Sequence, residues 1–429
     1  MTRVLIVGGG GREHALAWAC AQDHGVDIVC APGNGGTASI AKNVRVEVTD
    51  AAAVAALAVE EHADLVVVGP DAAAAAGVAD ACLRRGIAVF GPTAAAARIE
   101  SSKSFAKRLM DEAGIPTARW TSGGAGDRGR LRAFIAKLGG ACVIKADGLA
   151  LGKGVVVCDT ASDGERALAA CLDERRFGDA GMTVVVEERL AGPEVSVFGL
   201  CDGTRLRMLH TARDHKRLQD GDRGPNTGGM GAVSPSPDVD DALLDATITA
   251  VLQPCVDALK DRGTTFVGCL YAGLMLTDAG PRVLEFNARF GDPEAQVVLP
   301  LLDESALELL VACAHGRLEP GRARFGADTA LGVVTATAGY PGDVRTGDIV
   351  TGLDALDGDV LVFHGGTRRS DDGTLRTSGG RVLCVVALGA DVEAARSHAY
   401  ENLARVRFEG MQYRRDIGAA VTAFSAASP

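Results

Sequence analysis

The sequence of 429 residues predicts an α/β protein of several domains. In the first hundred residues, short Val/Ile/Leu-rich runs alternate with helical segments, which is typical of a doubly wound parallel sheet. From about Leu331 short strands and glycine-containing turns dominate, which indicates a small β-rich C-terminal domain. The succession of predicted elements, with the change in composition near Leu331, predicts an N-terminal domain over 1–102, a central body over 103–120 and 191–325, a hinged α+β lid over 121–190 and a C-terminal domain over 326–429.

The predicted strands of the N-terminal domain end in loops rich in glycine and proline. These loops read "GGGGREH", "APGNGGT", "GPDA" and "GPT". In open parallel sheets, ligands bind beyond the carboxyl ends of the strands. We therefore expect a binding site along this edge of the domain.

The central region combines helices with hairpins. The segment "SKSFAKRLMDEAG" predicts a helix from Ser102. The polar stretch from Thr121 to Arg130 predicts a flexible joint, and "ACVIKADGLALGKGVVVC" predicts two strands around a turn. Asp202-Gly203 marks a hairpin turn. A long helix over about 241–262 precedes a second hairpin that ends in "VLEFNARF".

Composition excludes several classes of protein. The formal net charge is −11, whereas a nucleic-acid binder would carry a basic face. No apolar run is predicted to span a membrane, and the first residues lack the features of a signal peptide. Eleven cysteines without a Cys-x-x-Cys pair predict reduced, mostly buried thiols in a cytoplasmic protein, and no interface pattern points beyond a monomer.

The glycine run in "VGGGGREHA" joins a predicted strand to a helix, an arrangement that suits a phosphate. It departs from a dinucleotide fingerprint, because the third glycine position falls on Glu13. Arg12 at the helix start suggests a monophosphate ligand instead. A tight turn without a ligand is the alternative interpretation.

Two lysines frame the turn of "VIKADGLALGKGV". Lys145 lies within an apolar strand, where its ammonium needs a partner, and a nucleotide phosphate is one candidate. Lys153, between two glycines, is placed to close over a ligand. Glu187 and Glu188 end a strand at the predicted junction of lid and body, where a purine and its ribose would lie. An edge-strand lysine with its amine in solvent is the alternative for Lys145.

The motif "VLEFNARFGDPE" carries the most specific signal. On a strand, alternation places Glu285, Asn287 and Arg289 on one face, and Leu284, Phe286, Ala288 and Phe290 on the other. Oxygen ligands from Glu285 and Asn287 suit a hard cation such as Mg²⁺ (or Mn²⁺) bound together with phosphates. Arg289 suits a carboxylate or a phosphate. An ordinary polar outer face is the alternative.

The stretch "GPNTGGMGAVSPSP", from Gly224 to Pro237, follows the basic segment "RDHKRLQDGDR". Its glycines would let backbone amides approach a phosphate or a developing oxyanion closely. On this hypothesis, valine at Gly228 or Gly229 lowers turnover and leaves the fold intact. A surface linker is the alternative.

Taken in order, the motifs resemble those of the ATP-grasp superfamily and, within it, of the phosphoribosylamine–glycine ligase family. The quoted segments share that family's order, and "APGNGGT", "DHKR", "YAGLM", "LGVVTATAGYPGD", "VFHGGT" and "GGRVLCV" extend the likeness over essentially the whole chain. The resemblance implies an ATP-grasp body with a hinged lid. It also implies ATP-dependent joining of glycine to 5-phosphoribosylamine through glycyl phosphate, in purine biosynthesis.

The resemblance assigns roles to individual residues. Catalytic roles fall on Asp214, Lys216 and Arg289. Asp214 and Lys216, with Arg217, would face the acyl-phosphate region, and Arg289 would help to hold glycine or phosphoribosylamine. Contacts with ATP fall on Lys103, Lys145, Lys153, Glu187, Glu188 and Glu194, the last as the ribose ligand. The metal ligands are Glu285 and Asn287. Substrate contacts fall on Gly10, Arg12, Asn34, Asp71, Asp292 and Glu294.

The sequence departs from the family pattern at one substrate loop. Where the family has Gly-Pro-Glu-x-Pro-Leu, this chain reads "GPDAAAAAG", which makes Asp71 one methylene shorter than the usual glutamate. The other hypotheses are a related ATP-grasp enzyme for a different carboxylate, an NAD-dependent oxidoreductase and a nucleotide sensor. The missing third glycine disfavours the oxidoreductase, and retention of Glu285, Asn287 and Lys145 disfavours the sensor.

Overall fold

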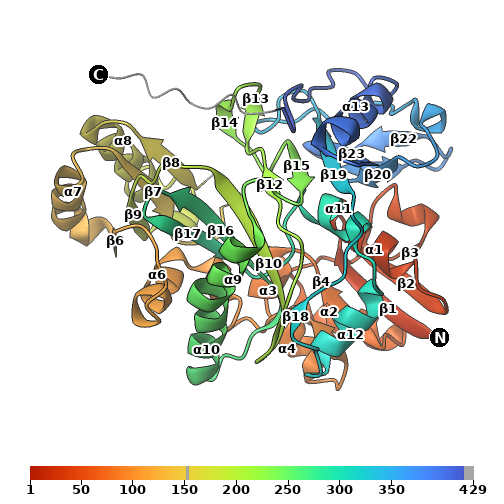
Figure 1. The fold of residues 1–429 in the computed structure, drawn as a ribbon, viewed down its shortest axis with the longest axis horizontal. Coiled ribbons are helices and arrows are strands. Elements are labelled where there is room, and N and C mark those ends of the chain that lie inside the picture. The colour runs from red at the N-terminus through yellow and green to blue at the C-terminus, as the bar shows by residue number, and fades with distance from the viewer. Residues whose placement is uncertain (151–153, 420–429) are drawn as a thin grey trace.

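A computed structural model describes residues 1–150 and 154–419. Figure 1 shows the lid elements at the far left, the N-terminal sheet at the lower right and the C-terminal elements at the upper right. The central sheet lies between the lid and the other two parts. The predicted mixed α/β architecture is confirmed.

The N-terminal sheet has the order β3-β2-β1-β4-β5, and all of its strands are parallel, as predicted. Alternate residues of β1 are buried in two different cores: Val4 and Ile6 pack on the side of α1, Leu5 and Val7 on the side of α2 and α4. The elements are β1 (Thr2–Gly8), α1 (Gly11–Cys20), β2 (Val26–Pro32), η1 (Thr37–Ser39), β3 (Lys42–Asn43), α2 (Ala51–Glu60), β4 (Leu65–Val68), α3 (Asp71–Ala75), α4 (Val78–Leu83), β5 (Ala88–Phe90) and α5 (Arg98–Ser101).

The lid is a four-stranded sheet of order β6-β9-β7-β8, with two helices and a small core of its own. The prediction of a flexible joint over Thr121–Arg130 is wrong. Thr121 and Ser122 pair with Val186 and Val185 in an edge strand, and a helix begins at Arg128. The elements are β6 (Trp120–Gly123), η2 (Ala125–Asp127), α7 (Arg128–Lys137), β7 (Cys142–Ala146), β8 (Val155–Cys158), α8 (Ala161–Leu172), η3 (Gly178–Gly181) and β9 (Val184–Glu188).

The central sheet has the order β17-β16-β10-β11-β18 and carries both predicted hairpins. Side chains of α6 and α10 share a core with one face of this sheet. The elements are α6 (Lys103–Glu112), β10 (Glu194–Asp202), β11 (Leu206–Met208), β13 (Arg217–Gln219), β14 (Arg223–Asn226), α9 (Asp241–Thr247), η4 (Ile248–Leu252), α10 (Gln253–Asp261), β16 (Val267–Thr277), β17 (Gly280–Asn287), α11 (Ala295–Val298), η5 (Leu299–Leu301), α12 (Ala306–Ala314) and β18 (Gly321–Arg322).

The C-terminal sheet includes two strands from the middle of the chain. Its order is β12-β15-β19-β23-β20, where β12 (Arg213–Asp214) and β15 (Gly231–Ser234) precede the predicted boundary at 326. The segment between these two strands therefore projects from the C-terminal sheet. The remaining elements are β19 (Thr329–Ala336), η6 (Leu353–Ala355), β20 (Leu361–His364), β21 (Thr367–Arg369), β22 (Leu375–Thr377), β23 (Arg381–Gly389) and α13 (Val392–Leu403).

The long helix over Asp241–Asp261 is continuous and contains a π-helical turn. By length and composition alone it is long and apolar enough to cross a membrane, which the sequence analysis did not predict. Its Val251, Cys255 and Leu259, however, are buried in the core of the central sheet. All eleven cysteines are unpaired and buried, as predicted.

Candidate active site

Charged side chains from three parts of the chain surround Glu285 near the end of β17. Lys103 begins α6, whose start is fixed by the Ser102 side chain accepting the Phe105 amide. Its Nζ lies 3.6 Å from Glu285 Oε2, and Lys216 Nζ lies 4.0 Å from Glu285 Oε1. We call Glu285 with Lys103, Lys145, Lys216 and Arg289 the charged centre.

The charged centre keeps Glu285 ionised. Burial alone would raise the pKa of this carboxyl, but Lys103, Lys216 and Lys145 outweigh burial and lower it to about 2. The pairs of Glu285 with Lys103 and Lys216 are longer than hydrogen bonds, and Lys216 also pairs with Glu194. This arrangement suits an anion with a bound cation.

The predicted alternation along β17 holds only in part. A register shift lies between the pairs Gly273↔Glu285 and Leu274↔Val283, and it leaves Leu284 without a partner in the ladder. As a result Val283, rather than Leu284, joins Phe286 in the core. The shift leaves the Leu284 carbonyl to accept a hydrogen bond from Lys145 Nζ, at 2.8 Å.

Arg289 is held by a residue that the sequence analysis missed. Glu100, 3% exposed, pairs with Arg289 Nη2 at 2.8 Å and accepts the Ala288 amide, also at 2.8 Å. Arg289 Nη2 also donates to Asn287 Oδ1 at 3.2 Å. The Arg289 Nε is buried and has no hydrogen-bond partner among the described residues. The guanidinium is thus fixed while one donor stays available.

Lys145 has a protein partner in this structure. Its Nζ lies 3.1 Å from Glu187 Oε2, and Lys107 Nζ lies 3.2 Å from the same oxygen. The predicted pair Glu187–Glu188 therefore divides: Glu187 points inward, whereas Glu188 pairs with Arg119 at the surface. Lys153 lies outside the described residues.

Lys216 lies at the base of the β13–β14 hairpin, which leaves the C-terminal sheet. It pairs with the predicted ribose ligand Glu194, and together with Glu285 this carboxylate raises the Lys216 pKa against the effect of burial. Asp214 lies two residues earlier, with one carboxylate oxygen unpartnered among the described residues. Burial, and then the nearby Glu294, raise the Asp214 pKa. Arg217, in contrast, donates to the Gly224 carbonyl at the surface.

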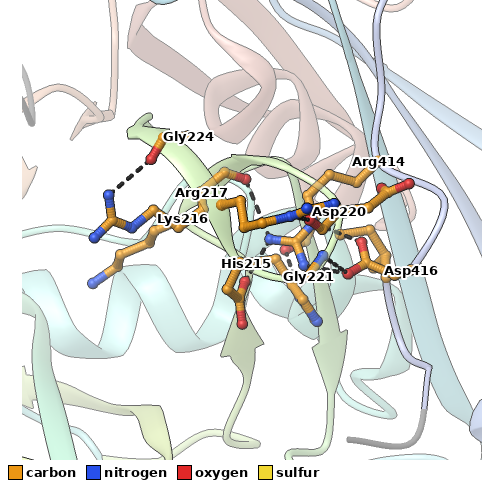
Figure 2. A network of polar contacts seen from close by, with 12 residues as sticks. His215, Lys216, Arg217, Asp220, Gly221, Gly224, Arg414 and Asp416 are labelled. Atoms are coloured by element: carbon orange, nitrogen blue, oxygen red, sulfur yellow. Dashed lines mark hydrogen bonds and ion pairs between the residues drawn. The ribbon is translucent and has the colours of Figure 1, made fainter.

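A second arginine network anchors this hairpin (Figure 2). Arg414, 2% exposed, pairs with Asp222 of the turn at 2.6 Å and with Asp416 at 2.7 Å, and it donates to the Arg217 carbonyl at 3.2 Å. Asp416 in turn accepts the Gly221 amide at 2.8 Å. The end of the described chain therefore fixes the element that presents Lys216.

The backbone of the glycine-rich loop forms hydrogen bonds with other groups of the protein. The Gly228 amide donates to Tyr340 OH at 2.9 Å, and the Gly229 amide to Thr227 Oγ1 at 3.0 Å. Arg381 Nη1 donates to the carbonyls of Gly228 at 2.6 Å and of Asp292 at 2.7 Å. A Cβ on Gly229 would meet Pro293 Cδ at 2.3 Å, so the expectation that valine at Gly229 leaves the fold intact is wrong.

Two acidic residues follow Arg289 at the same junction. The Asp292 carboxylate accepts from Gln296 Nε2 at 2.7 Å and lies 3.4 Å from Arg381. Burial raises its pKa, but Arg381 and Arg12 outweigh burial and lower it. Glu294 is 3% exposed and accepts from Ser196 Oγ at 3.3 Å.

The predicted phosphate loop at the N-terminus is occupied by its own glutamate. The Gly10 amide donates to Glu13 Oε2 at 2.6 Å, and Arg12 Nε donates to Glu13 Oε1 at 2.6 Å. A Cβ on Gly8, where φ is +127°, would meet Glu13 Cγ at 2.5 Å. The glycines here make room for Glu13, so an anion would have to compete for these donors.

Asn34 is equally satisfied. Its side-chain amide donates to the His364 carbonyl at 2.6 Å and its Oδ1 accepts the Gly36 amide at 2.8 Å. Together with the Gly8–Glu13 turn it forms what we call the loop cluster, which joins the N-terminal and C-terminal parts. Asp71 begins α3 and lies close enough to raise the pKa of Arg289 and of Glu100, after the larger effects of burial and of their mutual pairing.

The structure therefore brings most predicted residues to one junction. The charged centre, Asn287, Glu194, Asp214, Asp292 and Glu294 gather there, while Glu188 and Arg217 face away toward the surface. Sequence reasoning missed Glu100, Lys107, Arg381 and Arg414. Two of these, Lys107 in "SKSFAK" and Arg381 in "GGRVLCV", lie within motifs that had been singled out.

Models of three protein domains match the chain in the order of these parts. The N domain of phosphoribosylglycinamide synthetase matches residues 2–100, its ATP-grasp (A) domain residues 101–295, and its C domain residues 330–420. The chain belongs to the phosphoribosylglycinamide synthetase family. Members of this family contain an ATP-grasp domain, and Glu285 and Lys145 lie within it here.

Individual relatives of the family match over nearly the full length. The chain is 50% identical over 425 residues to phosphoribosylamine–glycine ligase of Streptomyces coelicolor, covering 97% of this chain and 99% of that protein. It is 46% identical to the Ralstonia nicotianae protein of the same name, covering 97% and 98%. The crystal structure of phosphoribosylamine–glycine ligase from Thermotoga maritima has a TM-score of 0.84 and 35% identity, covering 97% of this chain and 100% of that one.

Proposed function

We propose that this protein is an ATP-dependent ligase that joins glycine to 5-phosphoribosylamine, giving glycinamide ribonucleotide, ADP and phosphate in purine biosynthesis. One observation carries the proposal: a chain matched over its full length by phosphoribosylamine–glycine ligases places the charged centre inside its ATP-grasp region. The relatives' name defines the reaction, and the charged centre supplies groups suited to it.

The chemistry explains the need for ATP. An amine cannot displace oxide from the glycine carboxylate, so we propose that a carboxylate oxygen first attacks the γ-phosphorus and ADP leaves. The amine of phosphoribosylamine then attacks the carbonyl carbon of glycyl phosphate, inorganic phosphate leaves and the amine loses a proton. Catalysis of such transfers depends on positioning and on charge stabilisation.

For the nucleotide, we propose that Lys103 and Lys145 bind the phosphates, Glu194 the ribose, and the β9 edge at Glu187 and Glu188 the adenine. Glu285 and Asn287 fit a divalent cation bound with those phosphates, because both offer oxygen and the neighbouring lysines lower the pKa of Glu285 to about 2. That cation would neutralise charge on the transferred phosphoryl group. Mg²⁺ or Mn²⁺ suits this donor set, and Lys153 in the glycine turn is proposed as a further ATP contact.

For the substrates, we propose that Arg289 binds the glycine carboxylate, since its unpartnered Nε is available for an anion. Lys216 would neutralise the acyl phosphate. Asp214 and Glu294, which lie close together, would receive the amine, aided by Asp292. Gly10, Arg12, Asn34 and Asp71 are proposed to shape the sugar-phosphate side.

The domain boundaries predicted from the sequence remain our proposal, with the lid over 121–190 closing on the body and excluding water from glycyl phosphate. The eleven unpaired thiols support a reducing compartment, and we propose a cytoplasmic enzyme. We further propose a monomer that needs no nucleic acid or membrane, which light scattering on the purified protein would test.

The test is ADP release with each pairwise omission of ATP, glycine and phosphoribosylamine. We expect full turnover only with all three substrates, and glycinamide ribonucleotide as the product by mass spectrometry. ADP formation at full rate without glycine would contradict the proposal. Substituting alanine, serine or β-alanine for glycine distinguishes a related ligase of different carboxylate specificity.

A further inference from the structure

Lys107 has no part in the function described above, although it lies one turn after Lys103 on α6. Its side chain is 2% exposed. The Nζ donates to Thr117 Oγ1 at 2.7 Å and lies 3.2 Å from Glu187 Oε2. A lysine so deeply buried requires a specific reason, because desolvation of its ammonium is costly.

Lys107, Glu187 and Lys145 form a buried triad that joins α6 to two lid strands. Glu187 Oε2 lies 3.2 Å from one ammonium and 3.1 Å from the other. After burial, Glu187 and Lys145, Asp111 on the same helix also affects the pKa of Lys107. The triad thus carries two cations for one carboxylate.

The excess charge bears on how Lys145 reaches a ligand. If Lys145 were the sole partner of Glu187, turning it toward a phosphate would leave a buried carboxylate unpaired, which is strongly unfavourable. With Lys107 in place, the carboxylate keeps an ammonium at 3.2 Å after Lys145 leaves. Burial lowers the Lys107 pKa to about 8, with Glu187 opposing it, so the group is mostly protonated at neutral pH.

We propose that Lys107 is a positioning residue for ATP recognition, which stays paired with the Glu187 carboxylate so that Lys145 is free to bind a nucleotide phosphate. The proposal rests on the proposed role of Lys145 toward ATP. It predicts that Lys107 affects phosphate recognition and leaves recognition of the nucleoside unchanged.

The experiment compares AMP-PNP with adenosine, by competition against a fluorescent nucleotide, in the full-length protein. For Lys107→Met we expect AMP-PNP affinity to fall tenfold or more and adenosine affinity to stay within twofold. In the Glu187→Gln background the buried carboxylate is gone, so adding Lys107→Met should leave AMP-PNP affinity within threefold of that of Glu187→Gln alone. Lys260→Met, at an exposed lysine of α10, is the matched control and should change neither affinity.

Several results would overturn the inference. Equal losses for both ligands in Lys107→Met would mean a merely structural role. A Lys107→Met/Glu187→Gln variant that binds AMP-PNP tenfold more weakly than Glu187→Gln alone would do the same. This comparison decides the question if Lys107→Met alone fails to fold. Normal AMP-PNP affinity in Lys145→Met would remove its premise, whereas ADP release by the wild-type enzyme tests the ligase function separately.

Discussion

The charged centre and the loop cluster differ in how completely their polar groups are paired within the protein. Around Glu285 the pairs with Lys103 and Lys216 span 3.6 and 4.0 Å, which is longer than a hydrogen bond, and the Nε of Arg289 lacks a partner among the described residues. In the loop cluster the donors of Gly10 and Arg12 are bound by Glu13, and Asn34 is satisfied on both sides. Long ion pairs and a buried donor without a partner are characteristic of a binding site, whereas satisfied polar groups fix geometry.

This difference shows what each region contributes. The charged centre should govern rate and nucleotide affinity, and its substitution should change stability little. The loop cluster and the anchored hairpin should govern how the parts fit together, so that substitutions there change stability and activity in step.

The largest effect is expected at Glu285. Glu285→Gln should lower the rate of ligation by roughly 10²–10³-fold, because the centre loses the charge that would hold a divalent cation. ADP release at saturating substrates measures this, with urea unfolding as the check on folding. Glu165→Gln, in an exposed lid pair with Arg132, is the control and should match the wild type. A Glu285→Gln enzyme that keeps a third of the wild-type rate would contradict our assignment.

The glycine-rich loop offers a matched pair of substitutions. At Gly229, φ is +115° and a Cβ would lie 2.3 Å from Pro293, whereas at Gly228 it would meet only the flexible end of Arg381, at 3.0 Å. We expect Gly229→Ala to lose at least tenfold in kcat and about 1–3 kcal/mol in stability. Gly228→Ala should lose less of both. Equal effects at the two positions would show that the close contact with Pro293 is unimportant.

Arg414 tests whether the hairpin needs its anchor. Arg414→Gln leaves Asp222 and Asp416 without their shared cation, and should cost about 2 kcal/mol of stability and lower kcat several-fold through Lys216. Arg415→Ala is the control, because Arg415 bonds to the hairpin through its backbone amide, which donates to Asp220 Oδ1. Loss of stability with an unchanged kcat would separate the anchor from catalysis.

A pH dependence is expected next to the loop cluster, at His14 and His364. Burial lowers the pKa of His14 to about 4 and of His364 to about 3, so the unfolded chain binds protons more readily than the folded one. Stability should therefore be full above pH 6.5 and fall as the pH drops toward 4, by about 2 kcal/mol per histidine at pH 5. Buried His215, with a pKa of about 4, acts in the same direction.

Urea unfolding at pH 7.5 and 5.0 measures this dependence. His14→Gln keeps an acceptor for the His364 amide, which donates to His14 Nδ1 at 2.8 Å, and should lose part of the pH dependence. An identical drop in the variant and the wild type would assign the effect to other groups.

The sequence predicted the elements whose signals are local. The alternation of polar and apolar residues, together with the turn residues, identified the hairpin with Glu285 and Asn287. The succession of strand and helix segments identified the parallel sheet. The bulge at Leu284 was missed, because a register shift depends on the partner strand. Thr121–Gly123 was misjudged because glycine and serine obscured a strand that pairing with Val184–Val186 stabilises.

The supporting residues of the site could not be found from local patterns. Glu100 meets Arg289, Arg381 meets Gly228 and Arg414 meets Asp222, each across more than a hundred residues of chain. Tertiary packing decides which buried charged residues pair with one another, and these pairings cannot be inferred from composition. The resemblance located the reacting groups, while their supports became visible only in three dimensions.

Strands β12 and β15 have a consequence for any attempt to divide the protein. Strand β15 pairs along its whole length with β19. A fragment ending before Thr329 would therefore expose the unpaired backbone amides and carbonyls of β15, and a fragment beginning at Thr329 would expose those of β19. Because neither fragment would contain the complete sheet, we expect truncation at this boundary to yield protein that aggregates. Co-expression of both fragments should restore solubility.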